Sequence, residues 1–203
     1  MRIRCENNTA KYIFSFIYGV IDNEGVIDGM EEQVLIKKVQ SGDGDAMNIL
    51  IDEYYQSIFA FFYKNTGNYH QSKDLAQEVF IKMVAGISKY RPKTPFKNWL
   101  FTIASNHLKN YYRTLSRHPE CMEITDECIT TTNTIVDVGV ECDMRVALEH
   151  LPPEQREAVI LRYYNEFSIK EISRITGAME TTVKARIRYG LEKLKTELEG
   201  YNE

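Results

Sequence analysis

Apolar residues recur at helical spacing from residue 30 onward. The segment 31–64 predicts two helices, which are separated by the glycine-containing turn at residues 41–44. The second of these helices carries a stripe of apolar and aromatic residues that we expect to face a core, as such stripes usually do. The stripe consists of Ile51, Tyr54, Tyr55, Ile58, Phe59 and Phe62.

Two further helices complete the same region. Ser72 is a good N-cap residue, so we expect a third helix to begin there, with Asp74 in its first turn. Its apolar side would be Leu75, Val79, Phe80, Met83 and Ile87. The prolines of the loop 90–95 disfavour helix before them, and a fourth helix is predicted over residues 96–114. We expect that helix to bury Trp99, Leu100, Ile103, Leu108 and Tyr111.

The pattern divides the chain into an all-α arrangement of two small helical domains. Residues 30–115 form the predicted four-helix domain, and residues 116–142 are a Thr-rich, acidic, flexible linker without sustained periodicity. Residues 143–203 form the second domain: a helix to about His150, another after the prolines at 152 and 153, and a closing helix pair.

Residues 1–29 share neither the charge pattern nor the periodicity of the rest. One hypothesis is that Met30 is the native start, and an intact-mass measurement on protein from the native host would decide it. The alternative is an authentic extra helix, in which Ile13, Phe14, Ile17 and Tyr18 would share one face.

The net charge of −4 hides a strong asymmetry along the chain. Residues 88–117 hold seven Lys or Arg and no acid, whereas residues 118–150 hold eight acids and one base. Residues 174–195 hold six bases and two acids. Two basic blocks therefore flank an acidic one, and the acidic average does not exclude nucleic acid as a partner.

Cysteine usage and hydropathy narrow the class of protein. The four cysteines have no CxxC pair and no histidine at metal-ligand spacing, so we expect neither a metal nor a cofactor. Free thiols in a reducing cytoplasm are the favoured interpretation, and a redox role for those in the acidic segment is the alternative. The four cysteines of the chain are Cys5, Cys121, Cys128 and Cys142, and the last three lie in the acidic segment. No apolar stretch is long enough to span a membrane, so we expect a cytoplasmic protein.

The closing helix pair has the layout of a helix-turn-helix. Ser168 and Glu171 form a capping box, Gly177 lies in the turn, and Thr181 is the expected N-cap of the last helix. Val183, Ile187, Leu191 and Leu194 would face inward. The outward residues Thr182, Lys184, Ala185, Arg186, Arg188 and Tyr189 are candidates for major-groove contacts. The alternative is a plain helical hairpin with a solvated basic face.

The first basic block is a candidate surface for single-stranded DNA. Asn106, Asn110 and Arg113 fall at i, i+4 and i+7, and we expect them opposite the face of Trp99 and Ile103. Asparagines beside lysines such as Lys109 can hydrogen-bond unpaired bases. The preceding loop would add a stacking ring and phosphate contacts through Tyr90, Arg91 and Lys93. A solvated basic face, with Trp99 in the core, is the alternative.

Three motifs together resemble the extracytoplasmic-function sigma factors of bacterial RNA polymerase. They are DLAQEVFIK at residues 74–82, FKNWLFTIASN at 96–106 and LPPEQR at 151–156, in the order and spacing of that family. The resemblance covers about residues 30–115 and 143–197. It implies that these segments are sigma region 2 and sigma region 4, and that the chain is a transcription initiation factor without catalytic activity.

The resemblance also implies roles for individual residues. Asp74, Gln77, Glu78 and Phe80 match the helix that binds the clamp helices of the largest polymerase subunit. Tyr90, Asn106 and Asn110 match positions that hold extruded bases of the −10 element, and Lys184, Ala185, Arg188 and Tyr189 match the face that recognises the −35 element. The family also implies contact with the polymerase flap and often an anti-sigma partner. The proline-flanked loop 92–95, Tyr189 and Gly190 depart from the family pattern, so base preferences are not carried over.

The length of the linker indicates that a further protein holds the two domains apart on DNA. Family promoters place their two elements about 60–70 Å apart, at roughly 34–36 Å per duplex turn. A flexible linker of residues 116–143 has a root-mean-square span of about 30 Å and reaches about 95 Å only when fully extended. Core polymerase would hold it stretched. An operator-binding repressor would explain the closing helices but not the first basic block, and no catalytic arrangement supports an enzyme.

Overall fold

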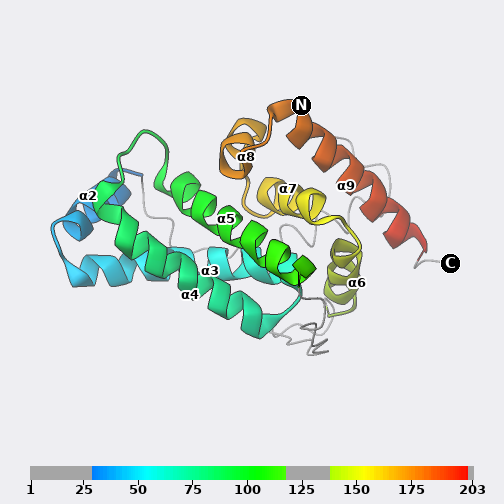
Figure 1. Ribbon diagram of the computed structural model, residues 1–203, viewed down its shortest axis with the longest axis horizontal. Coiled ribbons are helices and arrows are strands. Elements are labelled where there is room, and N and C mark those ends of the chain that lie inside the picture. The colour runs from blue at the N-terminus through cyan, green and yellow to red at the C-terminus, as the bar shows by residue number, and fades with distance from the viewer. Residues whose placement is uncertain (1–28, 118–137, 201–203) are drawn as a thin grey trace. The chain divides into compact units, whose positions relative to one another are not determined.

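The computed structural model describes residues 29–117 and 138–200, in which every regular element is a helix (Figure 1). The chain divides into two compact units, one built chiefly from Asp22–Pro119 and the other chiefly from Glu120–Ser173 and Ala178–Glu203. The first contains α2 (Gly29–Gln40), α3 (Gly44–Thr66), α4 (Tyr69–Gly86), the 3₁₀ turn η1 (Ile87–Lys89) and α5 (Phe96–Arg117). The second contains α6 (Val138–Glu149), α7 (Pro153–Tyr163), α8 (Ile169–Thr176) and α9 (Glu180–Gly200). The predicted all-α class is confirmed for these residues.

The turn between α2 and α3 lies where the sequence predicts it. Gly42 has a φ of 95°, which a residue with a Cβ rarely adopts. The Asp43 carboxylate then accepts a hydrogen bond from the Ala46 amide at 3.0 Å and caps α3. Local polar chemistry therefore ends one helix and begins the next.

The predicted start of α4 at Ser72 is wrong. The helix begins at Tyr69, because the Asn68 side chain accepts a hydrogen bond from the Gln71 amide at 2.9 Å and acts as the N-cap. Ser72 is buried inside the helix, where its hydroxyl lies 2.9 Å from that of Thr66. Asp74 is consequently beyond the first turn.

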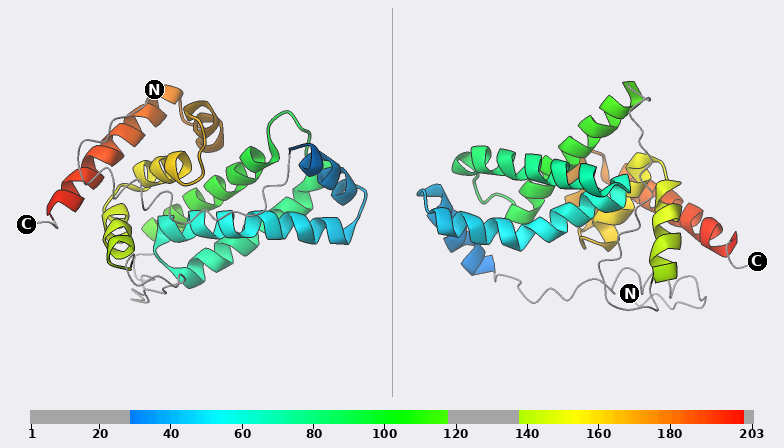
Figure 2. Two further views of the ribbon diagram at one scale, coloured as in Figure 1. Left: turned by 180° about the vertical axis from the view of Figure 1, so that it is seen from behind. Right: turned by 90° about the horizontal axis from the view of Figure 1, so that it is seen from below.

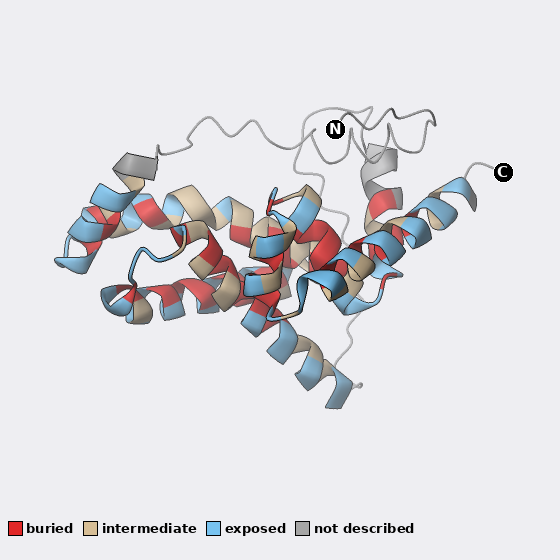
Figure 3. Cartoon of the chain, turned by 90° about the horizontal axis from the view of Figure 1, so that it is seen from above, coloured by how far each residue is buried: buried red, intermediate tan, exposed pale blue. Residues whose placement is uncertain are grey.

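The core of the first unit lies where α3, α4 and α5 pack on one another, as the buried residues in Figure 3 show. The predicted apolar side of α4 is buried as expected. The stripes predicted for α3 and α5 are partly wrong, because neighbouring positions take the central places. The fully buried residues include Leu50, Ile58, Phe61, Phe62, Met83, Leu100, Phe101 and Leu108. The half-buried residues, in contrast, include Ile51, Tyr55, Phe59, Trp99, Ile103 and Tyr111.

The second unit is organised around α9, which contacts both α6 and α7 (Figure 2). The predicted capping box is confirmed: the Ser168 amide donates to the Glu171 carboxylate at 2.9 Å, and the Glu171 amide donates to the Ser168 hydroxyl at 3.3 Å. Gly177 occupies the turn with a φ of 71°. Val183, Ile187 and Leu194 are buried, and Leu191 is half-buried.

Two predicted boundaries in this unit are wrong. Helix α6 begins at Val138, inside the segment predicted to be linker. Helix α9 begins at Glu180, so Thr181 lies inside its first turn and is not the N-cap.

Several expectations fall on parts of the chain outside the described residues. These concern the possible helix near residues 13–18, most of the linker and the four cysteine side chains. Within residues 29–117 and 138–200, no helix combines the length and the apolarity that crossing a bilayer requires.

Candidate nucleic-acid and protein interfaces

The outward face of α9 presents cationic and aromatic side chains on one helix. Thr181, Lys184, Arg188 and Tyr189 are exposed, and Thr182, Ala185 and Arg186 are half-buried beside them. The Arg188 guanidinium lies 4.6 Å from the centre of the Tyr189 ring and 3.8 Å from the Glu192 carboxylate. Small side chains flanked by Arg and Lys allow close approach to base edges and phosphates.

Gly190 has a packing role that its place in the sequence did not reveal. The residue is buried, and a Cβ added there would lie 2.8 Å from Val159 Cγ2 on α7. Real Cβ atoms do not approach so closely, so the glycine lets α9 pack tightly against α7. Its departure from the family pattern therefore concerns helix packing and not base recognition.

The predicted geometry of α5 is wrong in one respect that matters for function. Trp99 and Ile103 lie on the same stripe as Asn106, Asn110 and Arg113, because spacings of 4, 3, 4 and 3 residues return to one side of a helix. The exposure agrees: the tryptophan and isoleucine are half-buried, whereas the two asparagines and the arginine are exposed. The stripe therefore changes from apolar to polar along its length.

The polar end of this stripe has the chemistry to bind unpaired bases. Arg113 donates a hydrogen bond to the Asn110 amide oxygen at 2.7 Å, which fixes the orientation of that amide. Asn106 and Lys109 are exposed nearby on the same helix. An amide group both donates and accepts, as the edges of bases do.

The loop before α5 is held together by contacts among its own residues, and its tyrosine ring is not exposed for stacking. Tyr90 is only 7% exposed, its ring contacts those of Phe96 and Trp99, and its hydroxyl donates to the Thr94 carbonyl at 2.6 Å. Its ring is thus not available to a base in this conformation, and its contacts hold the loop together. Arg91 and Lys93 remain exposed.

The face of α4 differs in character from the DNA-binding candidates. Asp74, Gln77 and Glu78 are exposed as expected of a docking surface, whereas Phe80 is buried and stacks on Tyr55 with ring centres 6.0 Å apart. Phe80 therefore forms the floor of the surface. The acidic residues lie at its edge.

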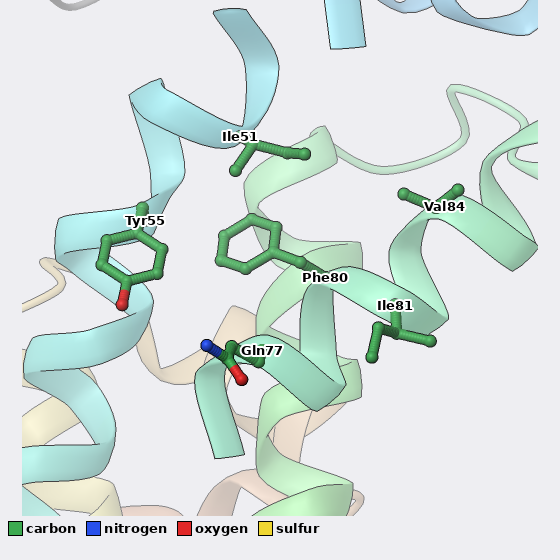
Figure 4. A pocket seen from close by; sticks show the side chains of 6 residues that line it. All are labelled: Ile51, Tyr55, Gln77, Phe80, Ile81 and Val84. Atoms are coloured by element: carbon green, nitrogen blue, oxygen red, sulfur yellow. The ribbon is translucent and has the colours of Figure 1, made fainter. Parts of the chain in front are cut away.

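A pocket of about 470 Å³ opens on this face between α3 and α4 (Figure 4). It is lined by Ile51, Tyr55, Gln77, Phe80, Ile81 and Val84. Ile81 is 67% exposed and Val84 is 47% exposed, which is unusual for large apolar side chains on one helix face. Sequence reasoning missed both residues, although their spacing from Gln77 by four and seven positions places all three on one stripe.

Glu78 also connects this face with α5. Its carboxylate lies 3.0 Å from Nδ1 of His107, whose side chain is buried. Burial and the nearby Lys82 ammonium lower the pKa of His107, and the Glu78 carboxylate opposes that change. The neutral imidazole is therefore the form favoured at neutral pH.

Within residues 29–117 and 138–200, no group of three or more His, Cys, Asp or Glu side chains gathers in a way that could hold a metal ion. The candidate surfaces consist instead of exposed cations, amides and apolar side chains, which suit binding.

Comparison with known proteins identifies both units. The family model Sigma-70 region 2 matches residues 50–118, and Sigma-70, region 4 matches residues 143–194. The chain is 28% identical over 178 residues to the ECF RNA polymerase sigma factor SigW of Bacillus subtilis. That match covers 80% of this chain and 94% of SigW. The chain is also 28% identical over 173 residues to the ECF RNA polymerase sigma-E factor of Escherichia coli K12, covering 78% and 89% of the two chains.

Two solved structures share the fold. The sigma factor RpoE from Bartonella quintana, in complex with the anti-sigma factor NepR, has a TM-score of 0.60 at 23% identity and covers 73% of this chain and 94% of its own. CnrH, in complex with the cytosolic domain of CnrY, has a TM-score of 0.64 at 20% identity, and the match covers 85% of this chain and 99% of CnrH.

Proposed function

This chain belongs to the extracytoplasmic-function group of sigma-70 factors, and we propose on that premise that its two units bind two different forms of promoter DNA. The chain directs RNA polymerase to promoters for the initiation of transcription. In our proposal the second unit binds duplex DNA at the −35 element, and the first unit binds the opened strand at the −10 element. The chain has no catalytic role and acts in the cytoplasm.

The exposed face of α9 supports the duplex role. A major groove accommodates a whole α-helix, and recognition requires side chains that project from it. Lys184, Arg188 and Tyr189 project in this way, and the capping box and turn glycine fix the helix pair behind them. Lys184 and Arg188 carry the charges that can reach a guanine edge or a phosphate.

The stripe on α5 supports the single-strand role. Asn106 and Asn110 offer amides to unpaired bases, and Arg91, Lys93 and Lys109 offer charge to phosphates. The half-buried Trp99 lies on the same stripe and gives it an apolar end. Extruding a base costs a few kcal/mol, so several such contacts must act together.

The face of α4 supports docking on core polymerase. The pocket between α3 and α4 combines an apolar floor with the exposed Ile81 and Val84, and Asp74 and Glu78 add negative charge beside it. An apolar patch with a charged rim is typical of protein interfaces. We assign this face to the clamp helices of the largest subunit and a region 4 contact to the flap. An anti-sigma factor is a further proposed partner, as in the similar RpoE complex.

The length of chain between the units is consistent with this division. Helix α5 ends at Arg117 and α6 begins at Val138, so 20 residues (118–137) join them. Such a segment spans at most about 70 Å, and a free coil of that length averages about 25 Å. Two promoter elements roughly two duplex turns apart therefore require the polymerase to hold the units in place.

Transcription by core polymerase from a promoter library tests the proposal directly. We expect new start sites that appear only when the chain is added. Specific binding to duplex operators without polymerase, and no new start sites, would instead favour a repressor.

A second experiment tests the docking face. Glu78→Lys should reduce co-purification with core polymerase about tenfold or more, because it reverses a charge on the rim of the surface. Asp45→Lys in the first turn of α3 is the control, because it reverses an exposed charge in the same unit that does not line the pocket. Unchanged co-purification of the Glu78 variant would remove the docking assignment.

A further inference from the structure

Gln40, the last residue of α2, is hydrogen-bonded to a segment far along the chain. Its Nε2 donates to the Ile87 carbonyl at 2.8 Å and to the Tyr90 carbonyl at 3.0 Å. These acceptors are 47 and 50 residues away in sequence. An amide NH₂ has two hydrogens, so both are used on main-chain acceptors of one short segment.

The two carbonyls lie where α4 and η1 end and the loop before α5 begins. The turn η1 follows α4 directly, and the Tyr90 amide donates to the Ile87 carbonyl at 3.1 Å. Carbonyls at the end of a helix have no partner within that helix. Gln40 adds a second donor to the Ile87 carbonyl and one to the Tyr90 carbonyl. The Arg91 guanidinium also donates to the Ser88 carbonyl at 3.2 Å and to the Tyr90 carbonyl at 3.0 Å.

The anchored segment determines where the candidate DNA-binding groups point. Gln40 donates a hydrogen bond to the Tyr90 carbonyl, and the Tyr90 ring packs against those of Phe96 and Trp99. Lys89, Arg91 and Lys93 are exposed around this fixed residue. Helix α2, which contacts η1, therefore fixes the backbone from which the cations extend.

We propose that Gln40 is a positioning residue for promoter opening: its side-chain amide holds the segment 87–93 in the conformation that receives the unpaired strand. This inference rests on the proposed −10 role of the loop and α5. A preformed loop favours binding because less ordering entropy is lost when the strand arrives. The residue acts through the loop and need not touch DNA itself.

Gln40→Met tests the inference, because methionine keeps the length of the side chain but lacks the two donors. Gln33→Met is the matched control, since Gln33 is exposed on the same helix. With full-length protein and core polymerase, we expect Gln40→Met to slow open-complex formation about tenfold, while polymerase binding stays within about twofold. Tenfold corresponds to about 1.4 kcal/mol, which is reasonable for two partly exposed hydrogen bonds.

A spectroscopic measurement separates positioning from general destabilisation. Trp99 is the single tryptophan of the sequence, and its ring centre lies 5.1 Å from that of Tyr90. We expect Gln40→Met to shift the Trp99 emission of the free chain and to speed hydrogen exchange at the Tyr90 amide, with no change for Gln33→Met. Gln40→Glu should have a larger effect, because its carboxylate would face two carbonyl oxygens.

The outcomes distinguish this inference from the proposed function. If Gln40→Met and Gln40→Glu both open promoters normally while Asn106→Ala with Asn110→Ala does not, the positioning role is overturned and the −10 assignment stands. An equal loss of polymerase binding and opening would also overturn it, because that is the result of a merely structural defect. If none of these variants affects opening, the −10 assignment itself fails.

Discussion

The two proposed DNA-binding regions are built in different ways. In the second unit the candidate residues project from the single helix α9, and Tyr189 is 49% exposed. In the first unit they come from a loop and from α5, and Tyr90 is 7% exposed because it packs inside the loop. One region presents a surface, and the other has an internally braced loop.

The difference matches the two forms of DNA. A duplex already displays its base edges in the major groove, so an exposed helix suffices to recognise them. An unpaired strand is flexible, and holding it requires several groups at fixed relative positions. In our proposal the contacts within residues 87–94 supply that fixation, so we expect this region to respond to changes in residues that do not touch DNA.

The two tyrosines give the largest expected contrast. Tyr90→Ala should lower the free energy of unfolding of the first unit by about 3 kcal/mol, because it removes a buried aromatic ring. Tyr189→Ala should change the stability by less than about 0.5 kcal/mol, since its ring is half exposed. Urea unfolding followed by Trp99 fluorescence and circular dichroism measures both. Equal losses would contradict the contrast between a braced loop and a displayed surface.

Helix packing in the second unit gives the next largest effect. Gly190→Ala should destabilise that unit by about 1–3 kcal/mol, because the new Cβ would overlap Val159. The Trp99 transition should not move, since that residue belongs to the first unit. Val159→Ala introduced together with Gly190→Ala should recover part of the loss, which a double-mutant cycle would show as favourable coupling. Additive losses would refute the proposed contact.

The sequence predicts the second unit better than the first. Its signals are local: a capping box and a turn glycine set Ser168, Glu171 and Gly177 through neighbours a few residues away. In the first unit, the rotation of the 22-residue helix α5 about its axis decides which side chains enter the core. Aromatic and apolar residues lie on several sides of this helix, so the pattern alone does not fix that rotation. The bonds of Gln40 span about fifty positions, and no local pattern predicts them.

The turn between α7 and α8 contains a correctable strain. Glu166 has a φ of 61°, where a side chain is unfavourable, so Glu166→Gly should stabilise the second unit by about 0.5–1 kcal/mol. Gly177 has a φ of 71° with open space where a Cβ would lie, so Gly177→Ala should destabilise by about 1 kcal/mol through backbone strain alone. Thermal unfolding by circular dichroism measures both, and shifts of the same sign would contradict the assignment.

The smallest expected difference between the two units is in how their free energies of unfolding depend on pH. Burial and Lys82 hold the pKa of His107 below its usual value near 6.5. Just below pH 6.5 the unfolded chain therefore binds more protons at this residue than the folded chain does. The first unit should therefore lose stability as the pH falls from about 7 through this window, and His107→Gln should reduce the slope. Trp99-detected urea unfolding at several pH values measures it. An unchanged slope in the variant would exclude His107 as the source.

Permanganate footprinting of polymerase complexes at one dependent promoter tests the division of labour most directly. Asn106→Ala with Asn110→Ala should leave the promoter bound but its −10 thymines unreactive, because the duplex contacts of α9 remain. Lys184→Ala with Arg188→Ala should instead reduce promoter occupancy, since the duplex contacts are lost. Wild-type thymine reactivity in the asparagine variant, with normal polymerase binding, would contradict the account.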